Sequence, residues 1–85
     1  MSNRTAVDEM LDKAKAYLKS HYGEDTVRMD VVENAVEDGE GTLKVECTVR
    51  FGGHESDWAK AFHFSAGEVV NMTARRMRRS EPPAS

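Results

Sequence analysis

The chain has 85 residues, with 12 Lys and Arg against 15 Asp and Glu, and a mildly acidic balance overall. This length accommodates one domain, at a size where folding buries only about 60% of the surface of the unfolded chain, so a spacious enzyme cleft is not expected. Cys47 is the only cysteine, which excludes an intrachain disulfide and a zinc site made of several thiolates. The first ten residues lack the apolar segment of a signal peptide, and apolar runs elsewhere are short. We therefore expect a cytoplasmic protein that does not span a membrane.

The first predicted element is a helix from Thr5 to Tyr22. Thr5 and Asp8 resemble a capping box at its start, and Gly23 supplies a left-handed stop at its end. Apolar residues recur at steps of three and four, which is typical of a helix with one buried face. This face comprises Val7, Met10, Leu11, Ala14, Tyr17, Leu18 and His21.

The pattern then changes to a period of two, which predicts strands. Residues 42–51, "TLKVECTVRF", place Leu43, Val45, Cys47, Val49 and Phe51 on one face. An earlier strand begins near Val27, and the opposite parity of its later valines predicts a bulge near Val31 and Val32. Asp38-Gly39 between the two strands predicts a hairpin turn.

The next turn, "GGHE", predicts a second hairpin with Gly53 and His54 as its two-residue loop. Counting from this loop pairs Val49 with Trp58, and Cys47 with Lys60. Apolar residues of the two strands then meet on one face.

The last segment, residues 63–77, allows two interpretations. Ser65-Ala66-Gly67 as a three-residue loop predicts a fourth strand that pairs Phe62 with Val70 and Asp57 with Arg75. Ser65 and Glu68 also resemble a capping box, which would start a helix at Ala66. We favour the strand because Gly67, Val69, Val70, Asn71 and Thr73 are poor helix formers.

These elements predict one α+β domain over residues 1–79, followed by a disordered tail at 80–85. One N-terminal helix packs on one face of a four-stranded antiparallel meander, and the other face meets water. In outline this order is similar to the core of the cystatin-like superfold, a helix wrapped by a curled antiparallel sheet. The likeness is one of topology and implies no activity.

A basic cluster closes the chain. Residues 1–74 carry eight Lys and Arg against fourteen Asp and Glu, whereas residues 75–85 carry four Arg against Glu81. Asp57, with Arg50 on one neighbouring strand, is expected to engage Arg75 on the other. Arg76, Arg78 and Arg79 then remain for an anionic partner such as nucleic acid, or simply form a solvated strand end.

The helical alternative for residues 66–79 resembles the double-stranded-RNA-binding domain in its order of elements, which would imply RNA binding. That family holds phosphates with lysines at the start of its second helix. Here the matching stretch reads "SAGEVV", with no cation and one Glu. The acidic stretch from Glu24 to Glu40 is also unsuited to a phosphate backbone.

Lys60 is the one local contradiction, because it shares the inward parity of Trp58, Phe62 and Phe64. A bulge could turn it outward, or its stem could extend past the helix edge to water. Alternatively, Lys60 and Trp58 could line a small ligand pocket, with Glu33 or Asp30 as counter-ion.

The remaining reactive side chains are expected to be structural. Cys47 shares its parity with core residues, His21 ends the helix stripe, and His54 lies in a turn. The sequence holds no nucleotide-binding loop, no metal-ligand spacing and no nucleophile with a base, so we expect neither an enzyme nor a cofactor. The leading hypothesis is a module that binds a protein partner, or a second copy of itself, through its sheet and two open edges.

Overall fold

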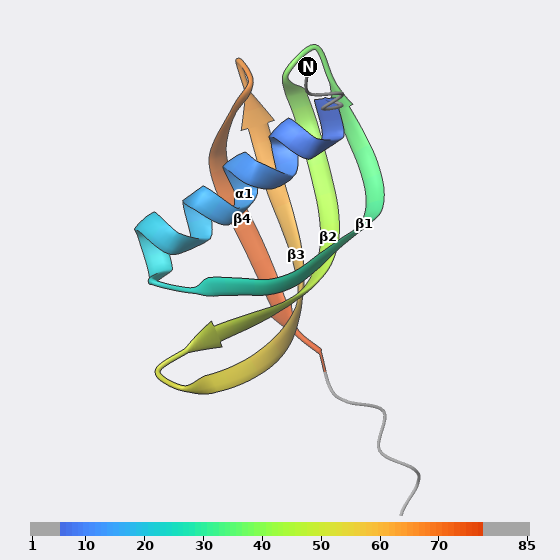
Figure 1. Cartoon of the computed structure of the whole chain (residues 1–85). Helices are drawn as coiled ribbons and strands as arrows, with labels where there is room; N and C mark the ends of the chain where they lie inside the picture. Colours follow the sequence, from blue (N-terminus) through green and yellow to red (C-terminus); the bar gives the residue numbers. More distant parts are fainter. Residues whose placement is uncertain (1–5, 78–85) are drawn as a thin grey trace, which may run out of the picture.

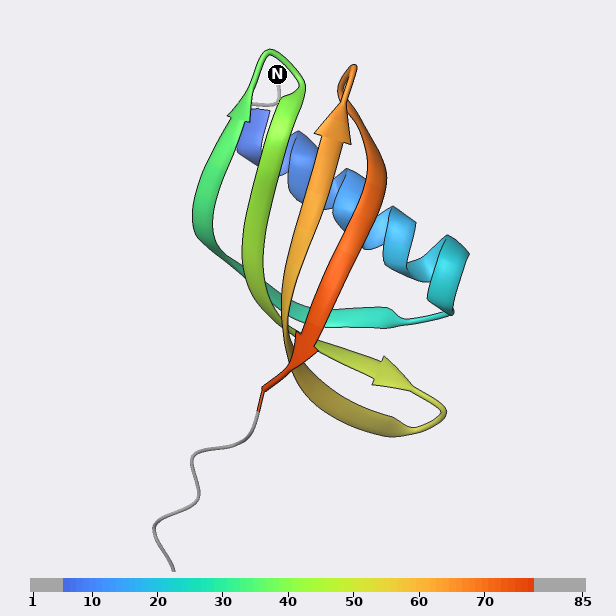
Figure 2. The ribbon, with the colours of Figure 1, turned by 180° about the vertical axis from the view of Figure 1, so that it is seen from behind.

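The structure is a computed structural model that describes residues 6–77. Over this range, helix α1 (Ala6–Tyr22) is followed by strands β1 (Asp25–Glu37), β2 (Glu40–Phe51), β3 (His54–Ser65) and β4 (Glu68–Arg76). The strands pair antiparallel in chain order. Figure 1 shows α1 lying across one face of a curved sheet, and Figure 2 shows the other face. The predicted α+β meander is confirmed. The predicted tail at 80–85 lies outside the described residues, as does Thr5.

Within residues 6–77, no helix is both long enough and apolar enough to cross a bilayer.

Helix α1 ends at the predicted residue. Gly23 has a φ of 67°, and its N–H donates to the carbonyl of Lys19 at 3.0 Å, which is the bond of a left-handed C-terminal cap. The N–H of Glu24 reaches back to the carbonyl of Leu18 at 3.3 Å. These bonds turn the chain sharply, so that Glu24 lies at the entrance to β1.

The core lies between α1 and the two central strands. Its most buried residues have the inward parity predicted from the sequence, and the ring of Tyr17 meets Phe62 edge-on at a centroid distance of 6.4 Å. Each fully buried aliphatic or aromatic side chain contributes about 1.5–3 kcal/mol by removal from water. The buried residues are Ala14 and Leu18 of α1, Leu43, Val45, Cys47 and Val49 of β2, and Phe62 and Phe64 of β3.

The predicted register between β2 and β3 is wrong by two residues. The loop consists of Gly52 and Gly53, not Gly53 and His54, because both glycines adopt positive φ values, 58° and 81°. Two positive values in succession define a type I′ turn, whose twist suits a hairpin. Val49 therefore faces Ser56, and Cys47 faces Trp58. A shift of two residues preserves parity, so the same side chains still point inward.

The fourth element is the predicted strand, and the helical alternative after Ala66 is wrong. Its register also differs from the prediction, because the loop is Ala66-Gly67, with φ values of 52° and 78°, instead of three residues. The shorter loop would reverse the faces of β4, but a bulge at Val70 restores them. Val69 consequently packs against the core, and Val70 is 60% exposed.

This register removes the predicted ion-pair triad of Arg50, Asp57 and Arg75. Arg50 instead pairs with Glu55 at 2.6 Å, and the Asp57 carboxylate accepts a hydrogen bond from the Thr48 hydroxyl at 2.6 Å. Glu55 also raises the pKa of Arg50 through this hydrogen bond. Arg75 lies opposite Ala59.

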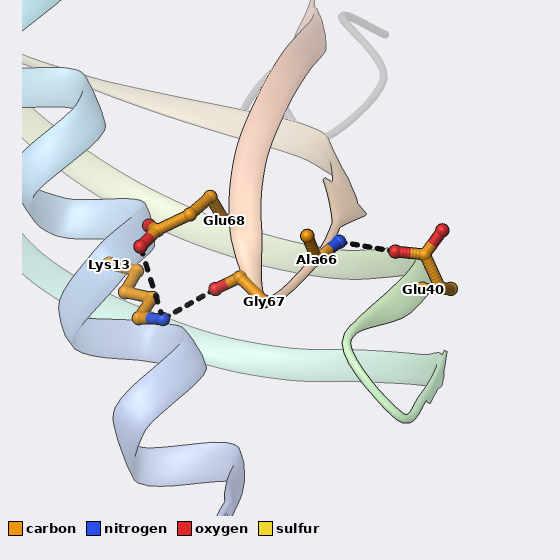
Figure 3. Close-up of polar contacts among 5 residues, drawn as sticks. All are labelled: Lys13, Glu40, Ala66, Gly67 and Glu68. Atoms are coloured by element: carbon orange, nitrogen blue, oxygen red, sulfur yellow. Dashed lines mark hydrogen bonds and ion pairs between the residues drawn. The ribbon is translucent and has the colours of Figure 1, made fainter.

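The two hairpin tips at the far end of the sheet are joined to each other and to α1 (Figure 3). The N–H of Gly67 donates to the carbonyl of Gly39 at 3.1 Å, and the N–H of Ala66 donates to the Glu40 carboxylate. Lys13 of α1 donates to the carbonyl of Gly67 and lies 3.7 Å from the carboxylate of Glu68. These contacts fix the helix over the sheet and leave the opposite face of the sheet open.

Candidate functional site on the outer face of the sheet

Lys60 occupies the inward position that its parity predicts. Its strand is regular there, since Lys60 pairs with Val45 on one side and Ala74 on the other. Its side chain is only 3% exposed, so the stem does not extend to water. The ammonium lies 3.1 Å from the carboxylate of Glu24, 5.0 Å from the ring centroid of Trp58 and 5.8 Å from that of Tyr22. The predictions of a bulge at Lys60 and of a side chain that extends past the helix edge to water are both wrong. Lys60 is a buried cation paired with Glu24.

The counter-ion of Lys60 is Glu24, and neither of the two predicted alternatives, Glu33 or Asp30, takes that role. Glu33 lies 3.8 Å from Lys44, and Asp30 lies 2.7 Å from Arg28. Glu24 replaces them, because the chain turns sharply at the Gly23 cap and brings the Glu24 carboxylate within 3.1 Å of the Lys60 ammonium. A ligand pocket formed by the Lys60 and Trp58 side chains stays a prediction. Lys60 is already occupied by Glu24, and the Trp58 indole N–H donates to the hydroxyl of Ser56 at 2.8 Å.

The basic cluster is described only in part, because Arg78 and Arg79 lie outside residues 6–77. Arg76 lies at the end of β4 opposite Trp58, and its side chain is exposed. Arg75 has the opposite parity and therefore points to the other face of the sheet. The two described arginines thus do not form one patch with a common direction.

The reactive side chains in the described range have structural surroundings. Burial raises the pKa of the Cys47 thiol to about 11, against the opposing effect of nearby Lys60. His21 stacks on Tyr17 at a centroid distance of 4.1 Å, and the ring of His63 is within hydrogen-bond distance of the Thr42 hydroxyl, at 3.1 Å. No group of three His, Cys, Asp or Glu side chains within residues 6–77 is placed to hold a metal ion.

The most distinctive surface feature is a depression of about 420 Å³ on the outer face of the sheet, opposite α1. Its floor is formed by Ala59 and Ala61 of the central strand β3, whose small side chains alternate with the core residues. The depression is bordered by Val32, Lys44, Val45, Glu46, Lys60, Thr73, Ala74 and Arg75. Val45, Lys60 and Ala74 have inward parity, so they border it through their backbone.

The outer-face depression has an ordered arrangement of charge. The pairing register places Glu46, Ala59 and Arg75 in one row across the three strands, and Lys44, Ala61 and Thr73 in the next. Lys44 has an ion-pair partner on β1, whereas the side chains of Glu46 and Arg75 have no ion-pair or hydrogen-bond partner among residues 6–77. An acid and a base without local partners therefore stand on opposite walls of an apolar floor.

The two strand edges are less suited to pairing than a plain meander would be. Each register shift in the described strands leaves one extra residue, and each extra residue is a valine: Val27 and Val32 in β1, and Val70 in β4. Bulges twist an edge and interrupt its row of hydrogen-bonding groups, which hinders addition of another strand. The bulge expected near Val31 and Val32 is confirmed, while those at Val27 and Val70 were not foreseen.

A second cavity of about 340 Å³ lies between the first half of α1 and the joined hairpin tips. Met10, Val36 and Phe64 contribute apolar surface to it, and Lys13 is its cation. Because Lys13 is held by Gly67 and Glu68, this cavity offers no unpaired cation for a ligand. The outer-face depression is the better candidate site.

Sequence reasoning missed Ala59, Ala61 and Glu46. The signal was present, because alanine is depleted in strands and two alanines alternate on the outward side of β3. Their importance depends on which side chains flank them, and that requires the correct register. Comparison of the chain with protein-family models, with curated proteins and with solved structures finds no match in any of the three.

Proposed function

We propose that this protein is a non-enzymatic assembly module that self-associates through its sheet. The observation that carries the proposal is the outer-face depression, an apolar floor inside a charged rim on a sheet face that nothing in residues 6–77 covers. Protein interfaces have this anatomy, with an apolar centre and a polar border. Exposed central-strand positions usually carry larger β-branched side chains, so two alanines there favour close approach of another surface.

The proposal also accounts for the charge pattern. Glu46 and Arg75 stand on either side of the alanine floor, and neither side chain is neutralised by another side chain within residues 6–77. A second copy of the chain carries the same acid and base, and it is therefore the simplest protein surface that complements both.

The test is the molar mass in solution, measured by sedimentation equilibrium from about 10 μM to about 1 mM, a range that detects dissociation constants up to the millimolar level. The mass of the 9.5 kDa chain should approach twice its monomer value at the upper end. A mass that stays at 9.5 kDa throughout would refute the proposal.

Two variants separate the face from the edges of the sheet. Ala61→Arg places a long cation on the floor of the outer-face depression and should weaken association. Ala74→Pro changes the exposed edge strand β4. The N–H of Met77 donates to the carbonyl of Asp57, and hydrogen-bonded pairs alternate along an antiparallel ladder. The N–H of Ala74 therefore lies on the open side of β4, where proline removes no internal bond. Edge pairing would be sensitive to Ala74→Pro and insensitive to Ala61→Arg.

A further inference from the structure

The row formed by Glu46, Ala59 and Arg75 specifies how a second copy would dock. Neighbouring strands lie about 4.8 Å apart, so the two charged residues flank Ala59 at equal distances on β2 and β4. Rotation by 180° about an axis that runs along β3, above the outer face, exchanges the two sides of that face. The side where one copy carries Glu46 then lies over the side where the other carries Arg75.

We infer that two copies dock outer face to outer face about such an axis, with Glu46 of each copy paired to Arg75 of the other. This inference rests on the proposed function and adds to it the partner surface and the pairing. The contact is isologous, so every dimer contains it twice. Packed sheets lie about 10 Å apart, a separation that extended Glu and Arg side chains bridge.

The neighbouring groups are compatible with this arrangement. The same rotation places Lys44, already paired with Glu33, over the neutral Thr73 of the second copy. Ala59 and Ala61 meet the alanines of the other copy and allow the faces to approach. The sheet curls toward α1 at its lower end (Figure 1), so the rows at that end turn away from a second copy. Direct pairing of like charges does not occur in either row.

The inference is tested with charge exchange. In a dimer of the Glu46→Arg variant, an arginine at position 46 of each copy would meet Arg75 of the other. In a dimer of the Arg75→Glu variant, a glutamate at position 75 of each copy would meet Glu46 of the other, so both single variants bring like charges together. Each single variant should dissociate at a concentration at least about tenfold above wild type, since the unfavourable contact occurs twice. The double variant E46R/R75E restores both pairs at the wild-type net charge and should dimerise like wild type.

Mixing the two single variants gives the sharpest result. A heterodimer of Glu46→Arg with Arg75→Glu contains only opposite-charge contacts, so the mixture should dimerise at concentrations at which each component alone is a monomer. Lys15→Glu, on the exposed side of α1, changes the net charge as Arg75→Glu does and should leave the dimer intact. Association of the wild type, of the double variant and of the mixed single variants should weaken with added salt.

The outcomes separate the two proposals. A wild-type chain that remains monomeric overturns both of them. A wild-type dimer that both single variants leave unchanged overturns the Glu46–Arg75 pairing and retains self-association by another part of the sheet. Failure of the mixed single variants to associate, when the wild type does dimerise, also overturns the pairing. Circular dichroism of each variant verifies that the fold is retained.

Discussion

Removing Glu24 should destabilise the protein far more than removing Lys60. The two charged groups lie 3.1 Å apart, and their side chains are 16% and 3% exposed. At an effective dielectric constant of about 20, the attraction at this distance is about 5 kcal/mol before the cost of desolvation. Glu24→Gln leaves the more deeply buried partner, an ammonium, without its counter-ion. We expect a loss of about 3–5 kcal/mol, as for other broken buried pairs.

Lys60→Met should have a much smaller effect. Methionine retains most of the side-chain volume and the contact with the Trp58 and Tyr22 rings, while the remaining carboxylate lies closer to water. We expect less than about 1.5 kcal/mol, the usual limit for volume-conserving replacements. The double variant E24Q/K60M should recover most of the stability lost by Glu24→Gln, because no charge is then buried.

The assay is urea unfolding followed by fluorescence of Trp58, the only tryptophan in the chain. A domain of this kind is held by about 5–15 kcal/mol, so the predicted loss would move the midpoint by a large part of its value. Unchanged slopes would show that the variants alter stability and not the extent of unfolding. The reasoning is refuted if Glu24→Gln loses less than about 1 kcal/mol, or if Lys60→Met loses as much as Glu24→Gln.

Three further predictions concern the frame of the fold. In urea unfolding, Gly41→Ala should lower the free energy of unfolding more than Gly53→Ala does. A Cβ at Gly41 would lie 2.1 Å from a backbone oxygen of β1. A Cβ at Gly53 meets no atom within 4 Å, so that variant should lose only about 1–2 kcal/mol, through its φ of 81°. Burial raises the pKa of Cys47 from 9.0 to about 11, so between these values the thiol ionises in the unfolded chain but not in the folded one. As the pH rises from 9 to 11, the free energy of unfolding of the wild type should therefore fall by up to about 2–3 kcal/mol relative to Cys47→Ala. Below pH 9 the two proteins should have the same pH dependence. Lys13→Met removes a hydrogen bond between α1 and the β3–β4 turn and should cost about 1–2 kcal/mol in thermal unfolding, with an unchanged melting temperature as the contrary result.

The sequence predicted the faces of the strands better than their partners. Inward parity was correct for Val45, Cys47 and Phe62, although both later hairpins were paired two residues out of register. Side chains alternate with a period of two, so an even error leaves the core intact. The β3–β4 case depends on compensation, because a loop one residue shorter than expected is balanced by the bulge at Val70.

The Lys60 counter-ion could not have been derived from strand patterns. Glu24 belongs neither to the helix stripe nor to an alternating strand, and it lies 36 residues from Lys60 in the chain. Its position depends on the angle at which the chain leaves the Gly23 cap, and on α1 then lying over the sheet. Local patterns specify each of these elements but not the distance between them.

The register determines which function the charged residues suggest. In the predicted register, Asp57 neutralises Arg75, and the remaining arginines point to an anionic partner. In the structure, the two-residue shift moves Arg75 beside Ala59 and across from Glu46, and Asp57 binds Thr48 instead. The Arg75 side chain thus has no ion-pair partner within residues 6–77. Glu46, in the same row across the sheet, has none there either. Arg75, which the predicted register assigned to Asp57, therefore favours pairing with a second copy, and the mixed-variant experiment decides whether that pairing occurs.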